Sequence, residues 1–181
     1  AMSFFETPSH VRAIQVVDTL AYVAVGMPGS DVGGWLIVDV GDAADPIELG
    51  VYTTPAAYAV DVQVVDTFAY LAIKHLNGGG ELWVLDVSDP ASPQELAVFA
   101  LPGDEARVQV VASKAIVANQ TGGLRVIDVS DPSSPAELGF YLPLFGVGQL
   151  SDVDVIGNSA YAVGVDGQLY VIELAIPCDD K

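Results

Sequence analysis

The side chains best suited to chemistry are few and lie far apart in the sequence. The chain has two histidines, His10 and His75, and one cysteine, Cys178, in the polar tail 178–181. Nucleophilic catalysis needs a serine or cysteine held beside a histidine base, and a zinc site needs three or four nitrogen or sulfur ligands. No motif here marks a nucleophile or completes a zinc ligand set. We therefore predict a protein that is not an enzyme and needs no cofactor, and a single cysteine leaves no internal disulfide.

The charge balance excludes several classes of partner. The 24 acidic residues outweigh the six Lys and Arg residues and give a formal net charge of −18. Such a surface repels the phosphates of nucleic acid and of anionic membranes. No apolar run reaches the roughly 18 residues that a membrane span requires, so we expect no membrane insertion. The acidic excess suits solubility, or else a cation or a basic ligand.

The elements that must position any site come from one unit repeated at a period of about 45 residues, which is typical of repeat architectures. Each copy opens with two apolar runs around a short polar break, the pattern of a β-hairpin. These hairpins are predicted at 16–25, 64–73, 110–118 and 155–163. A near-continuous apolar strand follows each hairpin, at 35–40, 82–87, 124–129 and 169–174.

Three copies continue with an Asp/Pro turn and a shorter strand. The turns are predicted at 41–46, 88–93 and 130–135, and the shorter strands at 48–52, 95–99 and 137–141. An aspartate side chain can accept a hydrogen bond from the N–H two residues on, and proline presets φ for the turn. We interpret the acids of these turns as turn caps: Asp39, Asp42, Asp86, Asp89, Asp128 and Asp131, with Glu173 in the fourth copy. Calcium loops are the alternative, but the twelve-residue EF-hand pattern is missing.

The motif cores Leu36-Ile37-Val38-Asp39 and Arg125-Val126-Ile127-Asp128-Val129-Ser130-Asp131-Pro132 resemble the LVIVD-repeat family. That family occurs in bacterial and archaeal cell-surface proteins and is regarded as propeller-forming. The resemblance implies a β-propeller and an extracellular or cell-surface location, and it carries no catalytic residues. The fourth copy departs from the pattern, because Glu173 takes the place of the aspartate and no Ser-Asp-Pro turn follows.

We predict an all-β fold: a β-propeller with four blades of four antiparallel strands, in a single domain over 1–181. The blades are expected at about 11–52, 58–99, 106–141 and 151–177, and the tail 178–181 is expected to be flexible. The segment 3–8 aligns with the outer strand and exit turn at 50–55, so we expect it to complete the fourth blade and close the ring. A closed monomer is the first interpretation. The alternatives are two chains that exchange these ends into an eight-bladed ring, and a piece of a longer propeller.

One polar position recurs on the innermost strand of every copy and is occupied by Gln15, Gln63, Gln109 and Asp154. In a ring these side chains surround the central channel. The functional interpretation is an ion or polar ligand on the axis, with Ca²⁺ as the metal that oxygen ligands suit. The structural interpretation is that these groups bond the backbone of the neighbouring blade or channel water, because buried amides need partners.

The equivalent position nearer the channel mouth differs between copies, with Ala13, Asp61, Arg107 and Asp152. A position that varies can be adapted to a ligand, whereas uniform positions serve packing. Connections on the same face add His10, Tyr58, His75 and Asp104. The first hypothesis is a module that binds a protein or glycan at this mouth. The second is a structural spacer ring within a larger surface protein, and the third is a hydrolase or lyase at the mouth.

Overall fold

The chain folds into four antiparallel sheets, and the computed structural model describes residues 3–26, 33–54, 56–104, 106–143 and 149–174. The first sheet holds β1 (Val11–Val17), β2 (Leu20–Val25), β3 (Gly34–Asp39) and β4 (Ile47–Thr53). The second holds β5 (Ala57–Val65), β6 (Phe68–His75), β7 (Gly80–Asp86) and β8 (Gln94–Leu101). The third holds β9 (Arg107–Val111), β10 (Lys114–Ala118), β11 (Leu124–Asp128) and β12 (Ala136–Tyr141). The fourth holds β13 (Leu150–Ile156), β14 (Ser159–Gly164) and β15 (Leu169–Glu173).

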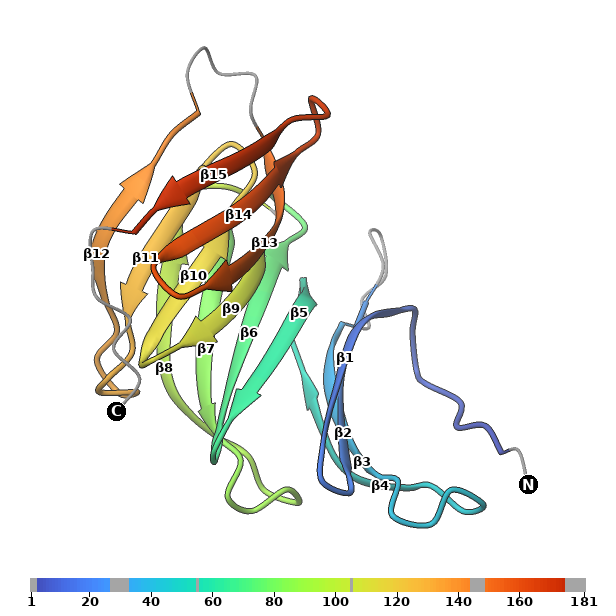
Figure 1. Cartoon of the computed structure of the whole chain (residues 1–181). Helices are drawn as coiled ribbons and strands as arrows, with labels where there is room; N and C mark the ends of the chain where they lie inside the picture. The colour runs from blue at the N-terminus through green and yellow to red at the C-terminus, as the bar shows by residue number, and fades with distance from the viewer. Residues whose placement is uncertain (1–2, 27–32, 55, 105, 144–148, 175–181) are drawn as a thin grey trace.

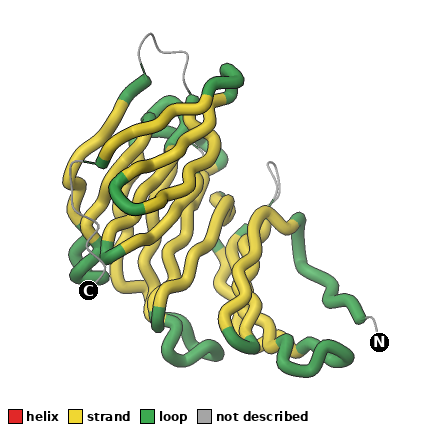
Figure 2. The backbone as a smooth tube through the Cα atoms, viewed as in Figure 1, coloured by secondary structure: helices red, strands yellow, loops and turns green. Residues whose placement is uncertain are grey.

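Every sheet is a meander in which each strand pairs with the next one along the chain (Figure 1). The described residues form strands, turns and loops and no helix (Figure 2), which confirms the all-β prediction. Tight turns join the first two strands of each sheet. The backbone enters the left-handed region in these turns, with φ of 52° at Asp18 and 54° at Asp66. Two-residue hairpin turns require this conformation. The described residues include no helix that is long and apolar enough to cross a membrane.

The Asp/Pro turns are held by the aspartate side chains, as predicted. Asp86 Oδ1 accepts a hydrogen bond from the N–H of Ser88 at 2.8 Å, and Asp89 Oδ1 accepts one from Ala91 at 3.1 Å. The first and third turns repeat both bonds through Asp39, Asp42, Asp128 and Asp131. The Ser88 N–H is also the main cause that lowers the pKa of Asp86. These acids therefore act as turn caps.

Successive sheets pack face to face. In the first sheet the side chains that turn toward the second are Tyr22, Ala24, Trp35 and Ile37, and we call these positions the forward face. The same positions of the second sheet pack on the third, and those of the third pack on the fourth. The opposite side of each sheet is its receiving face; in the first sheet it includes Ala21, Val23, Val25, Leu36 and Val38.

The fourth sheet has three strands, and the segment 3–8 is not one of its strands. Instead, Phe5 packs on the receiving face of the first sheet, and Ser3 donates a hydrogen bond to the carbonyl of Ala43. Figure 1 shows this segment leading away from β1 on one side of the molecule, while β15 lies on the other side. Paired strands must lie about 4.8 Å apart. Among the described residues, the segment 3–8 therefore contacts the first sheet, and the predicted closure of the ring is not confirmed.

Candidate functional site

The innermost strands of the four sheets, β1, β5, β9 and β13, line one open hollow. Its volume is about 420 Å³, and the four polar side chains aligned from the sequence all belong to its lining: Gln15, Gln63, Gln109 and Asp154. Apolar neighbours from the same strands, such as Ile14 and Val62, complete it. The repeat alignment thus brought together residues that lie well over a hundred positions apart.

Two of these amides join neighbouring sheets. Gln15 Nε2 donates to the carbonyl of Val64 at 3.3 Å, and its Oε1 accepts from the N–H of Val64. Gln63 Oε1 likewise accepts from the N–H of Val110 in the third sheet. A buried backbone N–H left without a partner is costly. These bonds support the structural interpretation of the glutamine position.

The other two members of this set are held differently. Gln109 Oε1 is buried and finds no hydrogen-bond partner among the described residues, although its repeat equivalents Gln15 and Gln63 bond the next sheet. Asp154 accepts from the N–H of Val155 in its own strand at 2.9 Å. Among the described residues, the junction between the third and fourth sheets therefore lacks the side-chain to backbone hydrogen bond that joins the first sheet to the second and the second to the third.

Asp61, Arg107 and Asp152 belong to the mouth, one step from the glutamine position. Asp61 accepts from the N–H of Val62 and from that of Val108 in the next sheet, both at 2.9 Å. Burial raises the pKa of Asp61, and the negative charge of Asp152 raises it further, while the two N–H groups and Arg107 act in the opposite direction. Asp61 is therefore a link between sheets and a poor candidate for an exposed ligand group.

The remaining mouth residues are also bonded within the protein. Arg107 Nη1 donates to two carbonyls, those of Val60 at 3.3 Å and Ala106 at 3.2 Å. Asp152 Oδ1 accepts from the N–H of Val153 in its own strand at 2.9 Å. Asp152 is exposed, whereas Asp61 and Arg107 are partly buried.

The four mouth residues predicted on the connections between strands differ in burial and in bonding. Tyr58 is 2% exposed, and the guanidinium of Arg12 lies 4.9 Å from the centre of its ring, so it offers no free surface. His75 Nε2 lies 3.0 Å from Glu81 Oε2. Asp104 accepts from the N–H of Gly79 at 2.8 Å in a neighbouring loop. His10 is exposed. Cys178 lies outside the described residues.

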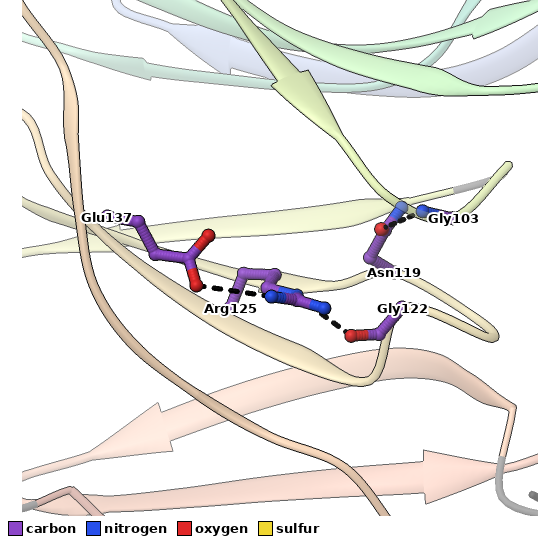
Figure 3. A network of polar contacts seen from close by, with 5 residues as sticks. All are labelled: Gly103, Asn119, Gly122, Arg125 and Glu137. Atoms are coloured by element: carbon purple, nitrogen blue, oxygen red, sulfur yellow. Dashed lines mark hydrogen bonds and ion pairs between the residues drawn. The ribbon is translucent and has the colours of Figure 1, made fainter.

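A buried asparagine that the sequence analysis did not single out organises the loops above the third sheet. Asn119 is fully buried, and its Oδ1 accepts from the N–H of Gly103 at 2.6 Å (Figure 3). Beside it, Arg125 donates to the carbonyl of Gly122 at 2.8 Å and pairs with Glu137 at 3.1 Å. The signal was available, because an amide directly follows the apolar run of β10, where the other copies have an apolar residue or glycine.

A smaller hollow of about 150 Å³ lies next to this loop. Its lining includes Ala106, Arg107, Gln120 and Ser151. The backbones of Gln120 and Leu150 exchange two hydrogen bonds across the third and fourth sheets. Of the predicted mouth residues, Arg107 lines this hollow and Asp152 lines the larger one. Across the described ranges, no three His, Cys, Asp or Glu side chains gather as ligands of a metal ion would.

Comparison with known proteins identifies the repeat and the fold. The family model described as "LVIVD repeat" matches three times, at residues 8–54, 56–100 and 102–142. A solved structure, the computationally designed Ika4 protein, is similar with a TM-score of 0.68 at 13% identity, over 96% of this chain and 97% of that one. The computationally designed Ika8 protein is similar with a TM-score of 0.63 at 14% identity, over 93% of this chain and 47% of that one. The chain thus spans about half the length of Ika8. A search among curated protein sequences gave no match.

Proposed function

The chain belongs to the LVIVD-repeat family, and from this premise we propose that it is a non-catalytic β-propeller module of a cell-surface or secreted protein, whose role is structural. In this role the repeat array is a rigid spacer within a larger surface protein. The surface location rests on the family resemblance. The structural role rests on what the inner polar side chains do.

The observation that carries this proposal is the use of Gln15, Gln63 and Asp61. Gln15 and Gln63 were candidates for holding a ligand on the axis and Asp61 for holding one at the mouth, and each bonds the backbone of the next sheet. A hydrogen bond inside a protein contributes about 1 kcal/mol, and an unpaired buried N–H costs more. Side chains that bond the backbone in this way favour the spacer over a ligand site in the channel.

We further propose that the segment 3–8 is the outer strand of the fourth blade. By alignment with β3 and β4, where Trp35 pairs with Tyr52, Phe5 takes the position opposite Leu169. The free edge of β15 borders a groove of about 270 Å³ between β12 and β15. The groove is lined mainly by apolar side chains, including Leu124, Val126, Phe140 and Ile172. An added strand would satisfy this edge and cover these side chains.

A second candidate function is a module that binds a protein or a glycan at the mouth. The observation that favours it is the hollow beside Arg107, Gln120 and Ser151, close in sequence to the exposed Asp152. Arg107 is one of only six Lys and Arg residues, so this region departs from the acidic character of the whole chain. Polar groups around a small hollow can orient a ligand.

Glycan arrays and arrays of surface proteins, probed with the fluorescently labelled chain, separate the two functions. The spacer predicts that no spot retains the wild type above an unrelated acidic protein. Specific retention that Asp152→Lys lowers at least tenfold, and that Val98→Asp leaves intact, contradicts the spacer and establishes the mouth as a binding site. Val98 is a suitable control because it is 43% exposed on the outer strand β8.

A further inference from the structure

The forward face of the fourth sheet is built like those of the other sheets but is uncovered. Leucine occupies one position of this face in three sheets: Leu82 is 0% exposed, Leu124 is 1% exposed and Leu169 is 64% exposed. Valine occupies the neighbouring position, where Val84, Val126 and Val171 are 0%, 6% and 64% exposed. Tyr161 and Val163 complete the face and are 37% and 42% exposed. These apolar side chains are suited to a following sheet.

The innermost strand of the first sheet also exposes apolar side chains, on the opposite, receiving face. Ile14 and Val16 are 61% and 54% exposed. Their equivalents in the second sheet, Val62 and Val64, are each 5% exposed because the first sheet covers them. The first sheet thus has a receiving face without a preceding sheet, and the fourth has a forward face without a following one.

Within the described ranges, the fourth sheet also lacks the polar links to a following sheet that the second sheet makes. In the second sheet, Asp61 and Gln63 accept hydrogen bonds from Val108 and Val110 of the third. Their equivalents in the fourth sheet are Asp152 and Asp154, for which the structure shows bonds to the backbone of their own strand. By the same alignment, a following first sheet would offer them the N–H groups of Ile14 and Val16.

The N-terminal segment already lies where the outer strand of a preceding blade belongs. The ring of Tyr52, on the outer strand of the first sheet, lies 5.9 Å from the ring of Trp83 in the second. Tyr141 lies 6.5 Å from Tyr170 in the fourth in the same way. Leu36 is the equivalent of Trp83, and Phe5 packs on the cluster that contains Leu36.

We infer that the fourth sheet of one copy docks on the first sheet and N-terminal segment of a second copy, so that two copies close one eight-bladed ring. Within one chain the two ends are complementary but lie apart (Figure 1), and a second copy presents the same receiving face without bending the array. Two identical junctions close such a pair with two-fold symmetry. The inference rests on the proposed completion of the fourth blade by the segment 3–8. The arrangement of sheets also occurs within a chain about twice as long.

A designed disulfide between Phe5→Cys and Leu169→Cys tests this docking in the 181-residue chain, with Cys178→Ser as the background. Directly paired β-strand residues lie within the distance that a disulfide spans. After oxidation, non-reducing electrophoresis reads out whether the bridge joins two chains or one. The pair Glu81→Cys/Ala100→Cys is the positive control, because these residues are register partners within the second sheet. Each single-cysteine variant is the negative control, and circular dichroism checks that the β structure is retained.

The expected result is a covalent dimer that forms in the double variant, at least tenfold more than in either single variant. A bridge within one chain overturns the docking of a second copy but keeps the segment 3–8 as the strand of the fourth blade. No bridge of either kind, while the control pair oxidises fully, overturns both the docking and the proposed strand. The failure of this inference and the failure of the proposed blade are thus distinguished.

Discussion

The forward faces of the second and fourth sheets carry equivalent side chains. Those of the second sheet are buried against the third sheet, and those of the fourth are exposed to solvent. Leu82 and Val84 are fully buried in the first case, whereas Leu169 and Val171 are 64% exposed in the second. The strands pair in the same register in both sheets. The comparison shows that burial here depends on the presence of a following sheet rather than on the local sequence. A repeat array therefore carries the same interface at its end as in its interior.

The largest expected effect comes from removing the shared leucine. Leu82→Ala should lower the free energy of unfolding by about 2–5 kcal/mol, because it removes buried methyl groups and leaves a cavity. Leu169→Ala should lower it by less than about 1 kcal/mol in dilute protein, where its side chain faces water. Urea unfolding at the lowest practicable protein concentration measures both. Equal losses would contradict the difference between the two faces.

A smaller effect is expected at the glutamine position. Gln63→Ala should destabilise the fold by about 1–3 kcal/mol, because the N–H of Val110 loses its acceptor. Gln109→Ala should destabilise it less, because its Oε1 has no partner to lose in the part of the chain that the structure describes. Thermal melts of the two variants, compared with the wild type, give the order. If Gln109→Ala is the more damaging substitution, the third and fourth sheets are linked more tightly than the structure shows.

The smallest effect is a difference in acid titration. Burial raises the pKa of Asp61 above 3.8, and the N–H of Ser88 lowers that of Asp86 below it. Asp86 therefore contributes stability above its unfolded-state pKa, which is lost as pH falls through the lowered value. For Asp61 the contribution is complete below its unfolded-state pKa and is lost as pH rises through the raised value. Carboxyl-carbon NMR should show Asp61 protonating at the higher pH, and the reverse order would remove Asp61 from its buried position between sheets.

The sequence predicted local structure well, because each part depends on near neighbours. The hairpins follow from short polar breaks between apolar runs, and the turn caps from aspartates two residues before a free N–H. The LVIVD assignment and the all-β architecture follow from the same repeats. Gln15, Gln63 and Gln109 line one hollow, since equivalent strands of a repeat occupy equivalent places.

Tyr58 could not be placed from the repeat alone. It was expected on an open face, but its side chain fills the space left by two glycines of the first sheet: a Cβ on Gly26 would lie 2.1 Å from the Tyr58 Cβ, and one on Gly33 would lie 2.8 Å from it. Arg12 then covers the ring. This burial depends on contacts between sheets that are distant in sequence.

The repeat alone also does not determine whether the ring closes. Whether β15 meets the segment 3–8 of its own chain depends on the angle between successive sheets, added over three junctions. A small difference in side-chain volume at each junction changes that angle, and the repeat period carries no record of it. The segment 3–8 was predicted to pair with the C-terminal strands, whereas Phe5 packs on the first sheet in this structure.

Solution mass measured by light scattering tests the docking of two copies most directly. The wild type should have twice the 18.8 kDa of one chain. The variant Leu169→Asp/Val171→Asp should have the single-chain mass with its β structure retained, because it places charges on the docking face. The matched variant Leu76→Asp/Val98→Asp, at positions 37% and 43% exposed elsewhere, should keep the doubled mass. A wild type that remains at 18.8 kDa at every concentration, or a docking-face variant that keeps the doubled mass, would contradict the account.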